Sequence, residues 1–573
     1  ERRGMMKVWN FSLVILTFFL TIFGTFMTRS GIVQSVHAFG EDKKLAWMFT
    51  FFMIFLLVVS FGFLLRRLPE LRSRAVLESP LSREAAFLVN NWILLLAAFF
   101  VLFATMFPTL SEAVTGERIS VGPPFFNQWM VPIGLILLLL TGIGPLIAWR
   151  KATVSHLRYQ FTWPVITTVA TVALCLFWGL GKASIAPIIA FAFCAFTAAT
   201  VVQEFARGAQ VRRKNTGSDY MTALLGMILR GRRRYGGYLV HLGIVLMFIG
   251  FAGQAYQKEE EQHLRPGQVV PFGKYQIRFD RLRHEEDRQK EMLTGDFTIL
   301  QGDGAGKEIG KMHPARWYFN GRNGEFTTEV AIRRSAAEDL YITLGGVDFA
   351  DGSGTFKLVI NPLVDWVWFG FILLALGTTI ALLPETALAP VAARAGIPAR
   401  GVGATGILVL IGLGLIAGMR PAHAAVDPGF IKSEMDWFGK NLRCMCSMGG
   451  RGCGHMLEDC GAECGGAPQD RQEIMNLLTQ GKTRQEIIDI FIKREGGAHV
   501  LGAPPDTGFN RLAWALPYGL GVLGAGALAF TAWRFSKRHK EPAPAETAAA
   551  EKSLTNDPTL EDRLEDELSR VDS

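Results

Sequence analysis

The feature that most constrains this chain is the repetition of apolar runs long enough to cross a lipid bilayer. A membrane-spanning helix needs about 20 consecutive, mostly apolar residues. Half of the 573 residues are hydrophobic and only 19% are charged, which excludes an ordinary soluble enzyme. We therefore expect a mainly α, polytopic membrane protein with about ten transmembrane helices. The predicted spans are 8–27, 45–65, 86–107, 129–149, 161–180, 184–203, 237–256, 364–383, 402–420 and 511–533.

Basic residues orient these spans in the membrane. Four basic clusters fall on one side if the spans alternate, and the positive-inside rule makes that side cytoplasmic. The formal net charge of +8 therefore reflects topology rather than nucleic-acid binding. The clusters lie within 2–7, 66–74, 150–158 and 207–234. The segments left outside are 28–44, 108–128, 257–362 and 425–508.

The first outside loop carries candidate cofactor ligands. It holds His37, and a neutral histidine ring nitrogen is a good iron ligand. Arg29 lies eight residues earlier, and arginine pairs well with carboxylates such as haem propionates. We interpret this loop as a haem-holding surface at the membrane face.

The second outside loop is rich in aromatic residues and stiffened by prolines over residues 121–129. An aromatic belt at the membrane interface is the favoured interpretation. A wall against a flat apolar ligand is the alternative.

His241 stands early in the seventh predicted span. A polar ring is costly in hydrocarbon, so such residues tend to face the bundle interior and to have a function. A hydrogen bond to a neighbouring helix is an equally good explanation. No other histidine lies inside a predicted span, so a second axial ligand to a haem would come from elsewhere.

Residues 257–362 change character, because period-two alternation replaces the apolar runs. Segments such as 275–279 and 356–360 alternate apolar and polar residues, as strands with one wet face do. We expect a small external antiparallel β domain. Its three histidines, His263, His284 and His313, have no metal-ligand spacing and are predicted to be surface residues.

A second exported part follows an apolar run that ends at Ala422-His423-Ala424, as in a signal peptide. We expect a small external helical-bundle domain beyond it. Thr483 to Glu486 form a predicted capping box for one of its helices.

The whole chain divides into seven predicted regions. They are a membrane bundle at 1–256, the β domain at 257–362, a transmembrane helix at 363–385, a linker with the signal-like span at 386–426, a helical thiol domain at 427–508, a transmembrane helix at 509–535 and an acidic, disordered tail at 536–573.

Five of the seven cysteines crowd into residues 444–464 of this exported domain. A Cys444–Cys446 disulfide would close a small, strained and easily reduced ring, which suits thiol exchange. Arg443 beside it would favour a thiolate. The alternative is structural: Cys453, Cys460 and Cys464 serve as a disulfide staple or a metal site, since four of the five cysteines, with His455 nearby, could bind zinc tetrahedrally. Cys175 and Cys194 lie inside apolar spans and are predicted to be inert.

Two parts of the chain resemble known families. Residues 1–385 closely resemble the C-terminal part of CcmF, the membrane haem lyases of bacterial cytochrome c maturation, and residues 427–535 resemble CcmH. The short sequence motifs that match CcmF are residues 7–10, 24–26, 28–31, 35–39, 124–127, 236–243 and 361–364. The motifs that match CcmH are residues 442–444, 478–483 and 514–517.

By that resemblance, His37 matches an external haem-ligating histidine, and His241 matches one of two histidines that hold a resident haem b. Cys444 and Cys446 stand where CcmH has a Cys-x-x-Cys pair, but one residue closer together. The family's tryptophan-rich loop, another external histidine and the second membrane histidine should all precede residue 1. We therefore expect this chain to be a fragment or one half of a split protein, with an N-terminal CcmF half as its partner.

The resemblance implies a cytochrome c haem lyase subunit of the bacterial inner membrane whose functional domains face the periplasm. It would receive substrate haem from a CcmE-like carrier and attach it by thioethers to the Cys-x-x-Cys-His motif of apocytochrome c. The CcmH-like thiols would keep that motif reduced. Zinc at the cysteine cluster is the less favoured cofactor. A haem transporter or export channel and a non-catalytic assembly platform stay open as alternatives.

Overall fold

The computed structural model describes residues 7–30, 43–71, 82–117, 119–147, 154–180, 184–302, 306–319, 326–383, 429–445, 455–458, 460 and 466–538. The chain divides into two compact units, and each is described by itself. The first contains Glu1–Ala85, Trp149–Lys151 and Gly519–Ser573. The second contains Ala86–Ala148 and Ala152–Tyr518.

Among the described residues, eight helices are long and apolar enough to cross a membrane, which confirms the prediction of a polytopic membrane protein. Of the two other predicted spans, 511–533 lies in helix α16 (Arg511–Arg538), which is not among the eight. The span at 402–420 lies outside the described residues. The eight helices are α1 (Lys7–Arg29), α2 (Lys43–Arg66), α4 (Arg83–Thr115), α5 (Pro123–Leu146), α6 (Val154–Phe177), α7 (Ile185–Thr216), α9 (Arg232–Gly253) and α10 (Asp365–Leu382).

In the first unit, α1 packs along α2, and the short helix α3 (Leu68–Leu71) follows α2. The threonines of α1 form a column at every fourth position. The hydroxyls of Thr17, Thr21 and Thr25 each donate to the carbonyl four residues earlier, at 2.7, 3.0 and 3.2 Å. These bonds satisfy polar groups that an apolar helix would otherwise leave unpaired.

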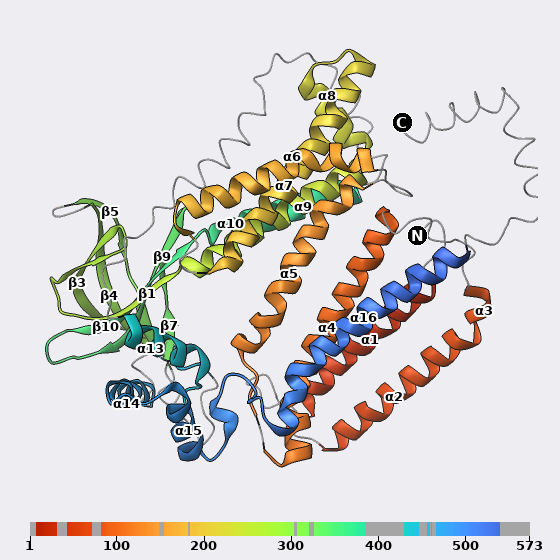
Figure 1. The fold of residues 1–573 in the computed structure, drawn as a ribbon. Helices are drawn as coiled ribbons and strands as arrows, with labels where there is room; N and C mark the ends of the chain where they lie inside the picture. Colours follow the sequence, from red (N-terminus) through yellow and green to blue (C-terminus); the bar gives the residue numbers. More distant parts are fainter. Residues whose placement is uncertain are drawn as a thin grey trace, which may run out of the picture. The chain divides into compact units, whose positions relative to one another are not determined.

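Helix α7 is the centre of the helical bundle in the second unit, where it packs against α5, α6 and α9 (Figure 1). Its buried face contains small residues such as Ala190 and Ala192, which allow neighbouring helices to approach closely. The hydroxyl of Thr197 donates to the carbonyl of Leu138 across 3.1 Å and so ties α7 to α5. The short helix α8 (Tyr220–Arg230) connects α7 to α9.

Helices α9 and α10 pack together through a seam of glycines. Gly236 and Gly243 of α9 face Gly377 and Gly370 of α10. A Cβ added to Gly243 would lie 2.7 Å from the carbonyl oxygen of Gly370, and one on Gly377 would lie 2.7 Å from that of Gly236. The seven-residue spacing keeps these positions on one helix face. The two backbones are therefore in direct contact, and any side chain at the seam would separate them.

Between α9 and α10 the chain forms a two-sheet β sandwich, which confirms the predicted antiparallel β domain. One sheet has the order β1-β10-β9-β8, and the other has β2-β3-β4-β6-β7 with β5 paired to β4. The strands are β1 (Lys258–Leu264), β2 (Val269–Phe272), β3 (Tyr275–Glu286), β4 (Lys290–Gln301), β5 (Lys307–Met312), β6 (Ala315–Phe319), β7 (Phe326–Glu329), β8 (Ala331–Arg333), β9 (Glu338–Val347) and β10 (Gly354–Pro362).

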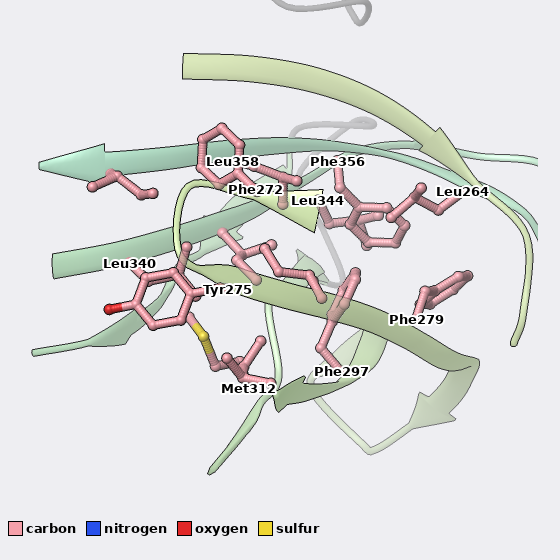
Figure 2. Packing of buried hydrophobic residues seen from close by; sticks show 14 of the residues in the cluster. Leu264, Phe272, Tyr275, Phe279, Phe297, Met312, Leu340, Leu344, Phe356 and Leu358 are labelled. Atoms are coloured by element: carbon pink, nitrogen blue, oxygen red, sulfur yellow. The ribbon is translucent and has the colours of Figure 1, made fainter. Parts of the chain in front are cut away.

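Aromatic rings from both sheets fill the core of the sandwich, as Figure 2 shows. Phe279 and Phe297 come from neighbouring strands of one sheet, and Phe356 comes from the other. Their ring centroids lie 4.7 to 5.1 Å apart in tilted and edge-to-face arrangements. Phe279 and Phe356 belong to the two segments in which the period-two pattern predicted a buried strand face, whereas Phe297 was not predicted. His263, His284 and His313 are all exposed, as predicted.

Three helices form the core of the thiol-bearing region: α13 (Gly429–Asn441), α14 (Ala467–Thr479) and α15 (Arg484–Glu495). Phe438, Ile474 and Phe491 are the centre of their shared core. The predicted capping box at the start of α15 is confirmed, because Thr483 and Glu486 each bond the other's backbone.

Candidate functional site

His241 lies on α9, which packs against α10 along the glycine seam and also against α7. The centroid of its ring lies 6.5 Å from that of Tyr238, one turn earlier on the same helix. Its Nδ1 is buried and meets no hydrogen-bond partner in the described part of the chain. A buried nitrogen without a partner is costly, so this imidazole fits a ligand site better than a structural hydrogen bond.

A cluster of charged side chains lies beside Tyr238. The carboxylate of Glu204, on α7, accepts a hydrogen bond from the Tyr238 hydroxyl at 3.0 Å and one from Arg234 at 2.7 Å. Arg207 approaches the same carboxylate at 3.4 Å and also donates to Gln160 of α6 at 2.7 Å. This cluster joins three helices next to the candidate ligand.

Glu204 was not predicted as a site residue, although the sequence carries a signal for it. Glu204 is the only acidic residue in α7 and comes at the end of a long apolar run. A lone acid in such a place is expected to pair with a cation on a neighbouring helix. The spacing of Arg234, Tyr238 and His241 along α9 completes the pattern, because it puts all three on one face.

Two of the predicted site residues belong to the first unit. Arg29 is the last residue of α1, and its side chain is exposed. His37 lies outside the described residues, so its role as an iron ligand stays a prediction.

The aromatic segment at 121–129 was predicted as a loop, but from Pro123 onward it belongs to α5, and the packing of its rings was not predicted. Phe125 is buried in a cluster with Phe100 and Phe107 of α4. The rings of Phe125 and Trp514 meet edge to face at 4.9 Å, and those of Phe107 and Phe509 stack at 5.8 Å. The start of α5 and the end of α4 therefore pack against the segment that follows the thiol-bearing helices.

Polar contacts join the same two regions. The Gly122 amide donates to the carbonyl of Gly502 at 2.7 Å, and the Gly502 amide donates to Asn441 at 2.8 Å. The hydroxyl of Ser111 bonds the side chain of Asn510 at 3.0 Å. The α4–α5 connection thus contacts the backbone that leads into the thiol segment.

Cys444 lies in a short extended segment whose backbone bonds are well defined. The neighbouring residue Arg443 pairs with Met456, and the Cys444 amide donates to the carbonyl of His455 at 3.0 Å. Cys444 is 1% exposed and Cys460 is 6% exposed, and both belong to the core of this region. Cys446, Cys453 and Cys464 lie outside the described residues. Within the described part, no group of three or more potential ligands forms a metal site.

Arg443 contacts the membrane bundle as well as standing next to Cys444. One of its amino nitrogens donates to the hydroxyl of Ser120 at 2.6 Å. Ser120 lies in the α4–α5 connection and is 8% exposed. Arg443, which was predicted to favour a thiolate at Cys444, therefore also links the thiol segment to the bundle.

Comparisons with known proteins agree with this arrangement. Residues 255–362 match the family model described as the CcmF C-terminal beta-sandwich. Residues 408–557 match the CcmH model, described as a cytochrome c biogenesis protein. The chain is of CcmF type and carries a CcmH-like region. The matched CcmF segment is the sandwich between α9 and α10, and the matched CcmH segment includes the thiol segment.

Named relatives extend the similarity over the CcmF-type part. The cytochrome c-type biogenesis protein CcmF of Pseudomonas aeruginosa is 30% identical over 387 residues, which are 67% of this chain and 56% of that protein. CycK of Rhizobium meliloti is 30% identical over 409 residues, which are 70% and 57% of the two chains. A solved structure of the cytochrome c heme lyase CcmF matches with a TM-score of 0.51 and 25% identity, over 67% of this chain and 56% of that one.

The chain spans a little over half the length of these relatives. The His241 side chain fits a haem iron ligand, because its buried Nδ1 meets no hydrogen-bond partner among the residues that the structure describes. Iron ligation by one ring nitrogen would give the ring a function and a fixed orientation.

Proposed function

We propose that this chain is a cytochrome c haem lyase subunit of the bacterial inner membrane, with its sandwich and thiol-bearing region in the periplasm. Its substrates are haem, delivered by a CcmE-like carrier, and apocytochrome c with a Cys-x-x-Cys-His motif. The proposal rests on the family membership and on one structural observation. The thiol segment is joined through Arg443 and Ser120 to the bundle that carries His241.

The thiols have a defined task in this proposal. A thiolate of the chain attacks the disulfide of the oxidised apocytochrome, forms a mixed disulfide and releases one cytochrome thiolate. The second thiol then attacks the mixed disulfide and releases the other. The cytochrome disulfide is reduced, and the Cys444–Cys446 pair is oxidised in exchange. Because Cys444 is buried, we assign the first attack to Cys446 and the resolving step to Cys444. A periplasmic dithiol reductant resets the pair.

The membrane side chains have a different task. His241, with a second histidine from another CcmF segment, holds a resident haem b, and that haem supplies one-electron reduction when it is bound. His37 and Arg29 hold the substrate haem at the outer face. Each cytochrome thiol then adds across one vinyl group, with sulfur bonding to one carbon and a proton to the other, so this step needs no net oxidation.

The test uses cells that carry the whole chain with its CcmF partner segment, with haem-stained gels to measure mature cytochromes c. Replacing Cys444 and Cys446 together by serine should lower maturation severely, and an external thiol reductant should restore it. His241→Ala should lower maturation without rescue by the reductant. Cys175→Ala is the matched control, since this cysteine is buried in α6 and has no proposed role.

The alternatives give different results in the same experiment. A haem transporter would keep its activity without Cys444 and Cys446. A non-catalytic platform would keep the absorption spectrum of the purified complex when His241 becomes alanine. Either result would contradict the proposed function.

A further inference from the structure

Three residues of α9 form one polar stripe along the helix. Arg234, Tyr238 and His241 are spaced four and three residues apart, which puts them on the same face. The Nε of Arg234 donates to the hydroxyl of Tyr238 at 3.2 Å, and the ring of Tyr238 lies 6.5 Å from that of His241. The stripe is continuous from the basic end of the bundle to the candidate iron ligand.

Charges at the start of the stripe do not balance. Two guanidinium groups, those of Arg234 and Arg207, share the single carboxylate of Glu204. The Glu204 side chain is 5% exposed and fully occupied by these donors and Tyr238. One positive charge is therefore left without a counterion in this cluster, and a lone charge at a membrane boundary is unfavourable unless it is solvated or paired.

Arg234 is the guanidinium that can take another partner. Its side chain is 57% exposed, and no described residue bonds its second amino nitrogen, Nη1. Glu204 and Tyr238 already fix the rest of the group, so its remaining N–H donors are held in one orientation. A planar guanidinium group with N–H donors held in one orientation is well suited to bind a carboxylate.

We propose that Arg234 binds a propionate carboxylate of the porphyrin whose iron is held by His241. The two residues are seven positions apart on one helix face, about 10 Å along the axis. A porphyrin that is bound edge-on beside α9 spans a separation of this size. This inference rests on the proposed function, and it assigns an orientation: the propionate edge points toward the basic end of the bundle.

The test compares two porphyrins that differ only in the group that Arg234 would bind. The whole chain, purified with its CcmF partner segment and depleted of haem, is titrated with haemin and with haemin dimethyl ester, and the absorption spectrum reports binding. Arg234→Gln should weaken haemin binding about tenfold. It should leave the affinity for the dimethyl ester unchanged, because that porphyrin has no free carboxylate.

Arg233→Gln is the matched control, because it removes the same charge from an exposed neighbouring position of α9 outside the stripe. It should change neither affinity. Equal weakening of both porphyrins by Arg234→Gln, or no weakening of either, would overturn the inference. His241→Ala separates the two proposals: loss of the spectral signature with both porphyrins supports iron ligation whatever Arg234 does. An unchanged signature contradicts the proposed function itself.

Discussion

Arg443 donates a hydrogen bond to Ser120 at 2.6 Å, although the two residues are 323 positions apart in the sequence. One belongs to the thiol segment of the CcmH-like region, and the other to the α4–α5 connection of the CcmF-type part. The contact joins the residue next to Cys444 to the connection between two membrane-type helices.

Removing this hydroxyl should make the thiol segment open more often. In a Cys446→Ser background, Ser120→Ala should raise the rate at which a maleimide alkylates Cys444 about fivefold, since one hydrogen bond contributes about 1 kcal/mol. Mass spectrometry of the labelled peptide measures the rate. Ser120→Thr keeps the hydroxyl and should restore the slow rate. Ser184→Ala, which removes a hydroxyl at the start of α7, should leave the rate unchanged.

The aromatic contact between Phe125 and Trp514 should hold the two regions together after the chain is cut. With a protease site inserted within residues 386–400, the two fragments should copurify in detergent. Phe125→Ala should reduce this copurification, because truncating a buried phenylalanine costs about 3 kcal/mol. Phe99→Ala, at an exposed position of α4, is the control. Separation of the wild-type fragments would contradict the prediction.

Adding one methyl group to the glycine seam should separate α9 from α10. Gly243→Ala should lower the midpoint of thermal unfolding in detergent, because its Cβ would lie 2.7 Å from a carbonyl oxygen of the other helix. Gly237→Ala on the same helix meets nothing within 4 Å, so it should be neutral or slightly stabilising. Equal effects of the two substitutions would show that helix propensity, rather than the seam, decides the outcome.

The stability of the thiol-bearing region should depend on pH through Glu434. Two hydrogen bonds from Arg484, at 2.6 and 2.8 Å, lower the pKa of Glu434 below its usual value of 4.5. A lowered pKa in the folded state stabilises the fold above pH 4.5, and this contribution disappears as the pH falls through the folded value. Glu434→Gln should therefore cost about 1 kcal/mol at pH 7 and little at low pH.

Hydrogen–deuterium exchange of the α15 amides measures this effect, because the pair joins α13 to α15. The difference between wild type and Glu434→Gln isolates one carboxyl group from the others that titrate nearby, such as Glu486. Glu473→Gln removes an exposed partner of Arg494 and should change exchange much less. A wild-type-to-variant difference that stays constant with pH would contradict the assignment.

Much of the fold could be predicted because its signals are local. Eight of the ten predicted spans correspond to long apolar helices in the described part of the chain. The alternation around Phe279 and Phe356 predicted buried strand faces, and Thr483 predicted a helix start. Each of these signals depends on neighbours within one element.

The candidate site was less predictable because its contacts join distant elements. His241 was found from its place in an apolar run, but its neighbour Glu204 lies on another helix and becomes visible only when α7 and α9 pack. The partner of Phe125 could not be deduced either, since Trp514 is almost 400 residues away. A periodic pattern tells which face of a helix is apolar, but not what will cover it.

The glycine seam also determines how the membrane helices respond to the domain between them. β1 follows the end of α9, and β10 leads directly into α10, so both ends of the sandwich are attached to the same pair of tightly packed helices. Because the two backbones are in direct contact, we expect α9 and α10 to move together when the sandwich tilts. The two helices would then rotate as one rigid pair, and the imidazole of His241, which lies on α9, would move with them.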